Sequence, residues 1–150
     1  YFCNMQVPKF LLKTVLNLAS QNDEISVVSD QIGAPTYSDD ISRVIATILP
    51  FIKNKNITNE IYHYSGKIFC SWYEFANIII KIAKEESMIK KTPILKSILA
   101  LEYPTLAKRP LYSCLSSEKI CAQFDIEPSD WKKGIKESLR SLKKQQDLEF

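Results

Sequence analysis

The stretch Asp30-Gln31-Ile32-Gly33-Ala34-Pro35-Thr36-Tyr37-Ser38-Asp39-Asp40 is the point around which the chain is organised. It holds one of only three glycines in 150 residues, two positions before a proline. Before it, Ile25-Ser26-Val27-Val28 has the pattern of a short buried strand, and after it Ser38 can cap a helix. A strand that runs into a glycine–proline turn and then a capped helix exposes backbone amides, which suit a polar ligand. An ordinary strand-to-helix connection explains the same residues, so the turn alone leaves both interpretations open.

Composition predicts an ordinary soluble domain with one core over residues 1–150, because 45% of the residues are apolar and 25% are charged. A net charge of +3 gives no case for a nucleic-acid partner. Apolar runs such as Ile78-Ile79-Ile80 are broken by nearby lysines, so no membrane span is expected. Without a secretory signal pattern, the expected location is the cytoplasm. A first residue other than Met, Tyr1, favours a fragment or a processed chain.

The cysteine and histidine pattern argues against a metal site. Cys3, Cys70, Cys114 and Cys121 form no C-x-x-C pair, and His63 is the only histidine. A structural zinc site therefore lacks its ligands, and no other metal is expected. The thiols are expected to be reduced and mostly buried, and His63, lying between two tyrosines, is expected to be structural.

Caps and apolar periodicity predict an α/β protein with five or six helices and a few short strands. The clearest helix start is Ser71-Trp72-Tyr73-Glu74, which has the form of a reciprocal capping box. The final helix carries a basic face that we interpret as solvated rather than membrane-bound. Helices are expected over about 8–20, 39–52, 71–83 and 92–99, from 116 for a short helix, and from 129 onward; strands are expected near 25–28, 61–64 and 112–115.

Catalytic and cofactor motifs are missing from the sequence. Gly33, Gly66 and Gly134 lie more than thirty residues apart, so the chain has no dinucleotide-binding fingerprint, Walker loop or nucleophile elbow. Side chains that can bind a ligand are nevertheless present in Lys108-Arg109-Pro110, where the proline disfavours a helical conformation at Arg109. The planar guanidinium there could clamp a phosphate, although a solvated surface arginine explains the same pattern.

Two separated segments resemble motifs of the dTDP-4-dehydrorhamnose reductases. Asp30-Gln31-Ile32-Gly33-Ala34-Pro35-Thr36 matches their D-Q-x-G-x-P-T motif. Tyr103-Pro104-Thr105, followed by Ala107-Lys108-Arg109-Pro110, Ser113 and Leu115, resembles Y/F-P-T-P-A-x-R-P…S-x-L. Between them, 61–66 and 71–76 resemble the family's IYHxxG…SWYEFA region, and 126–131 resembles its closing helix start. The resemblance covers nearly the whole chain.

The resemblance implies that this chain is the C-terminal, substrate-binding half of an extended short-chain dehydrogenase with a Rossmann-like fold. Such enzymes reduce dTDP-4-dehydro-L-rhamnose to dTDP-L-rhamnose with NADPH or NADH. The cofactor glycines and the catalytic Tyr-x-x-x-Lys pair of the family would lie in an N-terminal Rossmann part that this chain does not contain. The chain alone is therefore expected to bind no NADPH and to be inactive, and the complete enzyme is a candidate homodimer.

The resemblance also implies a set of substrate-binding residues and no catalytic ones. Arg109 is placed near the diphosphate, and the turn that begins at Gln31 lies around the dTDP moiety. Relatives have an asparagine just before the first helix's apolar start, where this chain has Lys9 or Phe10. The substrate-binding set is Gln31, Gly33, Ala34, Pro35, Thr36, Lys108 and Arg109.

Two alternatives to the reductase remain open at this point. One is a non-catalytic regulatory subunit on the same fold, like the methionine adenosyltransferase beta subunit. The other is a generic α/β domain whose motifs match by coincidence. The presence of a Tyr-x-x-x-Lys pair upstream of this chain would separate the enzyme from the regulator.

Overall fold

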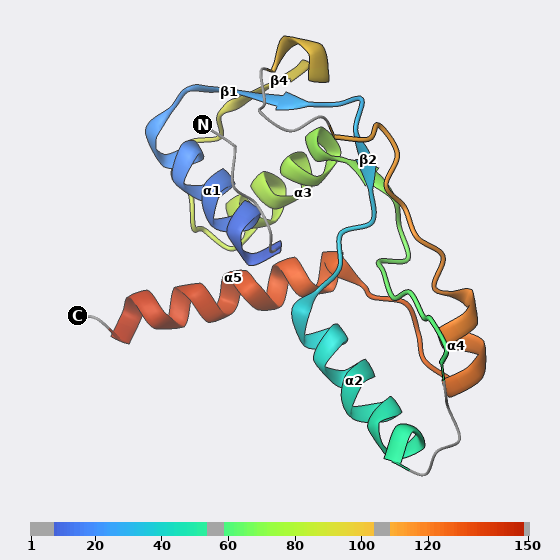
Figure 1. Ribbon diagram of the computed structural model, residues 1–150. Helices are drawn as coiled ribbons and strands as arrows, with labels where there is room; N and C mark the ends of the chain where they lie inside the picture. Colours follow the sequence, from blue (N-terminus) through green and yellow to red (C-terminus); the bar gives the residue numbers. More distant parts are fainter. Residues whose placement is uncertain (1–7, 54–58, 104–108, 149–150) are drawn as a thin grey trace.

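The computed structural model describes residues 8–53, 59–103 and 109–148, and it is an α/β structure rich in helix with short strands (Figure 1). Helices α1, α3 and α5 lie beneath the strands β1 and β4, whereas α2 and α4 form a separate lobe. In chain order the elements are α1 (Pro8–Gln21), β1 (Glu24–Val28), β2 (Ile32–Gly33), α2 (Ser38–Lys53), β3 (Cys70–Ser71), α3 (Trp72–Glu85), β4 (Ile94–Ile98), the 3₁₀ helix η1 (Ala100–Glu102), α4 (Glu118–Phe124) and α5 (Trp131–Leu148).

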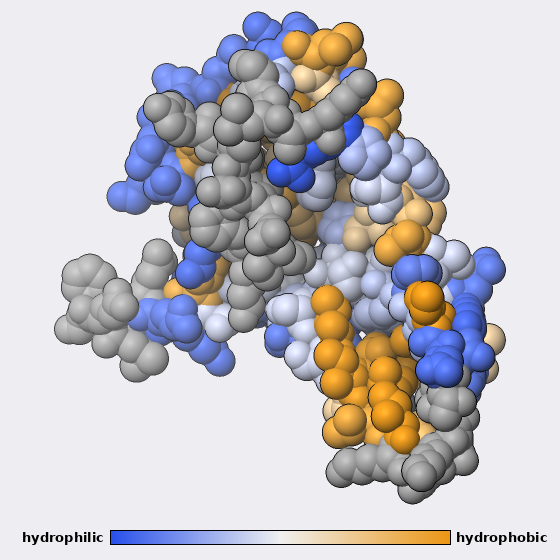
Figure 2. Space-filling view, viewed as in Figure 1, coloured by the Kyte–Doolittle hydropathy of each residue, from blue (hydrophilic) through white to orange (hydrophobic). Residues whose placement is uncertain are grey.

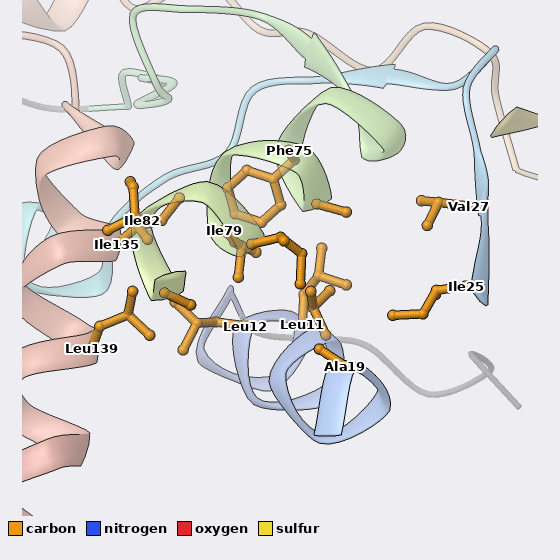
Figure 3. Packing of buried hydrophobic residues seen from close by; sticks show 14 of the residues in the cluster. Leu11, Leu12, Ala19, Ile25, Val27, Phe75, Ile79, Ile82, Ile135 and Leu139 are labelled. Atoms are coloured by element: carbon orange, nitrogen blue, oxygen red, sulfur yellow. The ribbon is translucent and has the colours of Figure 1, made fainter. Parts of the chain in front are cut away.

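Helix α3 is the centre of the main core. Its apolar face contains Phe75 and Ile79, which belong to one buried cluster with Leu12 of α1 and Leu139 of α5 (Figure 3). Ile79 and Leu139 are fully buried, so this three-helix contact excludes water. Each such side chain contributes roughly 1.5–3 kcal/mol to the free energy of unfolding. The core therefore provides a rigid base for the loops at the start of α3.

The predicted capping box at the start of α3 is confirmed. The Ser71 hydroxyl accepts a hydrogen bond from the Glu74 amide at 3.1 Å, and the Glu74 carboxylate accepts one from the Ser71 amide at 2.7 Å. These bonds satisfy amides that the first turn of a helix leaves without partners. The Ser71 amide and, next, the Ser71 hydroxyl, which donates to Glu74 Oε2 at 3.0 Å, stabilise the carboxylate and so lower the pKa of Glu74 below its ordinary value of 4.5.

The expected helix over 92–99 is wrong, because this segment contains the strand β4. β4 runs parallel to β1, with Glu24 opposite Ile94 and Val28 opposite Ile98. Proline at 93 favours an extended conformation for the residue before it, and β1 offers a free row of backbone groups. Tertiary pairing therefore outweighs an apolar spacing that also fits a helix.

Two other predicted strands are reduced or absent, whereas the strand near 25–28 is confirmed as β1. Residues 61–64 form no strand, although their burial alternates as a strand's would. Tyr62 and Tyr64 face the small core around Phe124, and their hydroxyls donate to Gln123 and to the Glu127 carbonyl. The segment 112–115 contributes only one bridge, between Tyr112 and Ile32. Neither segment therefore forms a strand ladder in the described part of the chain.

Helix α2 departs from expectation in its first turn and carries an apolar surface. Ser38 is the first helical residue instead of the cap, and its hydroxyl lies 3.4 Å from Asp39 Oδ1. One side of α2 packs against α4 through Val44. The other side is exposed over Ile45 and Leu49, and it forms the hydrophobic surface in the lower part of Figure 2. No described residue covers that surface.

Candidate ligand-binding site

The two motif segments meet at Ile32. In strand β2, Ile32 lies opposite Ser71 of β3 in an antiparallel pair. On its other side, the Ile32 amide donates to the Leu111 carbonyl at 2.7 Å, and the Ser113 amide donates to the Ile32 carbonyl at 3.0 Å. Segments about eighty residues apart in sequence are thus joined directly by backbone hydrogen bonds. This brings the start of the first motif next to the loop that carries Arg109.

The beginning of the motif is fastened to the end of β4. The Asp30 carboxylate accepts a hydrogen bond from the Ala100 amide at 2.9 Å. One residue earlier, Ser29 makes three hydrogen bonds to the end of β4. Its amide and its hydroxyl donate to the Ile98 carbonyl at 3.0 and 3.2 Å, and its hydroxyl accepts from Ser97 at 2.7 Å. These contacts hold Gln31, the next residue, at the edge of the β1–β4 sheet.

The end of the motif is held by the N-terminal side of α5. The Tyr37 amide donates to the Ser129 hydroxyl at 2.9 Å, and that hydroxyl donates to the Asp40 carboxylate at 2.6 Å. Ser129 and Asp40 are buried. Burial, and next the hydrogen bond to Asp39, raise the pKa of Tyr37 to about 12, so its hydroxyl stays protonated and donates. The turn between Gly33 and Tyr37 is therefore fixed at both ends.

A pocket of about 110 Å³ lies between α1, β1, the start of α3 and the residues Tyr103 and Arg109. That volume has room for several water molecules, so the described residues provide part of a site rather than an enclosed cavity for a large ligand. Most of its wall is aliphatic, and its polar side chains include one amide and one guanidinium. The lining residues are Leu11, Val15, Ser26, Val27, Val28, Gln31, Trp72, Ala76, Ala100, Tyr103 and Arg109.

The structure divides the predicted site residues into two groups. Gln31 and Arg109 both line this pocket, and Arg109 is exposed to solvent. Pro35 and Thr36 instead line a smaller hollow against α5, beside Trp131.

The remaining predicted residues have other positions. Gly33 is buried in β2, and the Ala34 carbonyl accepts a hydrogen bond from the Thr36 hydroxyl at 3.0 Å. Lys108 lies outside the described residues. The middle and end of the motif therefore shape the turn, while its Gln31 end reaches the pocket together with Arg109.

Trp72 and Tyr103 also line the pocket, and the sequence pattern did not single them out as site residues. Trp72 was assigned to the apolar face of its helix. Only the pairing of the preceding Ser71 with the motif strand, which the sequence does not reveal, brings Trp72 to the pocket. Tyr103 belongs to the second motif, but its side chain had no assigned role.

Within 8–53, 59–103 and 109–148, no group of three or more His, Cys, Asp or Glu residues could hold a metal ion. In the same segments no helix is long and apolar enough to cross a membrane. His63 is exposed and lies outside the pocket. Burial, and then the nearby Glu74 carboxylate, raise the pKa of the Cys70 thiol to about 12, which makes it a poor nucleophile.

Comparison with solved structures shows that the fold is similar to part of Rossmann-like reductases. A dTDP-4-dehydrorhamnose reductase from Clostridium acetobutylicum matches with a TM-score of 0.72 and 33% identity, over 88% of this chain and 43% of that one. The same enzyme from Bacillus anthracis, solved in complex with NADP, matches with a TM-score of 0.70 and 27% identity, over 87% of this chain and 42% of that one.

The sequence defines the family more closely. The family model described as the RmlD substrate binding domain matches residues 5–144, so the chain belongs to the RmlD substrate binding domain family. A curated dTDP-4-dehydrorhamnose reductase from Aggregatibacter actinomycetemcomitans is 43% identical over 126 residues, which are 83% of this chain and 43% of that protein. The chain thus spans less than half the length of the curated relatives that it matches.

Proposed function

We propose that this chain is the nucleotide-sugar-binding part of a dTDP-4-dehydrorhamnose reductase, which reduces dTDP-4-dehydro-L-rhamnose to dTDP-L-rhamnose with NADPH or NADH. The observation that carries the proposal is the meeting of two family motifs at Ile32, which places Gln31 and Arg109 in one pocket. Membership of a substrate-binding family and similarity to reductases of that name support the same conclusion.

In this proposal the chain's residues bind and orient the substrate. Arg109 pairs with the diphosphate, since a planar guanidinium can donate two parallel hydrogen bonds to phosphate oxygens. Aliphatic side chains such as Val27 and Leu11 exclude water from one side of the ligand. A reduced nicotinamide would supply the hydride for the 4-keto carbon, and the tyrosine of a Tyr-x-x-x-Lys pair would supply the proton for its oxygen. Both would belong to the N-terminal part that we propose for the complete enzyme. Asp30 and Ser29 support the chemistry only by holding the pocket edge in place.

The remaining proposed contacts with the substrate come from the motif turn and from Lys108. Gly33, Ala34, Pro35 and Thr36 are proposed to present the turn next to the ligand, and Lys108 to supply a second cation near the phosphates. A cytoplasmic location and a homodimer of the complete enzyme belong to the same proposal and rest on the resemblance to the family.

The test uses the complete gene product that contains this chain. When the purified protein is mixed with NADPH and dTDP-4-dehydro-L-rhamnose, it is expected to oxidise NADPH in proportion to the dTDP-L-rhamnose formed. The isolated 150-residue chain serves as the control and is expected to oxidise none. A complete protein that binds dTDP but consumes no NADPH would support the regulatory interpretation instead. NADPH oxidation by the isolated chain would contradict the assignment of the cofactor site to another part.

A further inference from the structure

Gln31 and Trp72 lie directly next to two paired strands, β2 and β3. Ile32 and Ser71 are opposed in the antiparallel β2–β3 pair, and Gln31 precedes the first of them while Trp72 follows the second. Opposed neighbours in an antiparallel pair extend their side chains toward the same side of the sheet. Both side chains accordingly line the pocket, which also contains Arg109.

The orientation of Trp72 is set before any ligand binds. Trp72 is the first residue of α3, whose first turn is fixed by the capping box between Ser71 and Glu74. Its ring lies edge-on to Phe75, with centroids 6.4 Å apart and planes at 73°. Phe75 in turn packs edge-on against the buried Trp131 at 5.2 Å. A side chain that is already ordered loses little conformational entropy on binding, so Trp72 is suited to a binding role.

The side chains of the pocket match a flat heteroaromatic ring joined to a phosphate. Trp72 offers a broad ring surface, and an aromatic side chain can stack on any nucleobase. Gln31 carries both a donor and an acceptor for the polar edge of such a ring. Arg109 provides a cation for the phosphate that follows. We infer that the base of the nucleotide stacks on Trp72 and that the Gln31 side-chain amide forms hydrogen bonds with the edge of the base. This inference rests on the proposed function.

Calorimetric titration of the complete protein with dTDP and, separately, with inorganic pyrophosphate tests this inference. Trp72→Leu is expected to weaken dTDP binding roughly tenfold or more, because stacking on the base is lost. Pyrophosphate affinity should stay within about twofold, since it has no base. Trp72→Phe keeps an aromatic face and should recover part of the dTDP affinity. Phe69→Leu is the matched control, because Phe69 is an exposed aromatic residue close in sequence whose ring contacts Tyr112 instead of the pocket.

A direct optical measurement adds a second readout. Stacking of the base is expected to quench part of the tryptophan fluorescence when dTDP is added, and this part should be missing in Trp72→Phe. Unchanged dTDP affinity in Trp72→Leu would overturn the inference, and so would an equal loss for dTDP and pyrophosphate, which would indicate a general structural defect. If the complete protein reduces the keto-sugar but Trp72→Leu binds dTDP with unchanged affinity, the role of Trp72 is refuted and the proposed function stands. Trp72-dependent dTDP binding without turnover would refute the proposed reaction and leave the base site intact.

Discussion

Replacing Gly66 by alanine should destabilise the protein much more than replacing Gly33, the glycine of the motif turn, by alanine. A Cβ atom at Gly66 would lie 2.0 Å from the Pro35 carbonyl oxygen and 2.9 Å from Trp131 Cδ1. The backbone there cannot easily retreat, because hydrogen bonds on both sides of Gly66 join it to Ser129: the Lys67 amide donates to the Ser129 carbonyl at 3.0 Å, and the Ser129 amide donates to the Ser65 carbonyl at 3.2 Å.

The expected cost follows from this confinement. Overpacking in a well-packed interior typically costs about 1–3 kcal/mol, and two backbone segments must separate here, so we expect about 3 kcal/mol or more. Gly33→Ala is the matched control, since its added Cβ would lie 3.4 Å from Ser113 Oγ, an ordinary contact. Its free energy of unfolding should change by less than about 1 kcal/mol.

Urea denaturation of the complete protein and its two glycine variants measures both effects. Titration with dTDP alongside should show weaker binding in Gly66→Ala, because the displaced Pro35 carbonyl belongs to the motif turn. Equal unfolding free energies for Gly66→Ala and the unmodified protein would refute the close approach. Destabilisation of the same size in Gly33→Ala would show that the two sites do not differ in packing as described.

Three further predictions follow from single side chains. Arg109→Ala should weaken dTDP binding roughly ten- to a hundredfold, because a charge-assisted hydrogen bond is lost, and Arg109→Lys should recover only part of the affinity. Calorimetry measures the affinity, and an unchanged affinity with a lower Tm would show that Arg109 is a structural residue. The lowered pKa of Glu74 means that its contribution to stability is complete above the ordinary value of 4.5 and is lost as pH falls through the folded pKa. Denaturation of Glu74→Gln between about pH 3 and 6 should therefore show a weaker pH dependence, and an unaltered slope would contradict this. With a pKa raised to about 12 by burial, Cys70 should resist iodoacetamide in the native protein and react after unfolding, and rapid native labelling detected by mass spectrometry would contradict its burial.

The parts of the fold that the sequence predicts well are those set by local contacts. Pro8 at the start of α1 and the Ser71–Glu74 capping box are both confirmed, because helix starts depend on residues within one turn. The segment 94–98 was missed because its state depends on β1, about seventy residues earlier. Residues 61–64 show the same limit: their alternation correctly indicates which side chains face inward, but it cannot indicate whether a backbone partner exists.

The candidate site was predicted only as far as the family motifs extend. From the residues alone, Arg109 could equally be a surface arginine, and only the resemblance placed it with Gln31. The structure adds that Ile32 joins the two motifs, which no local pattern reveals. Trp72 could not be assigned to the pocket from periodicity, because the same apolar face also fills the core through Phe75.

The joining of distant segments at Ile32 has a consequence for how the protein folds. The Ser29–Ile98 and Ile32–Ser113 contacts close loops of about seventy and eighty residues, and closing a long loop costs chain entropy before any contact compensates for it. Folding dominated by such distant contacts is slow, so the pocket is expected to form late. A ligand that needs both sides of the pocket has no site in partly folded chains. Its binding would then draw the population toward the finished structure by mass action, and a nascent chain could not bind it until the segment with Arg109 had been synthesised.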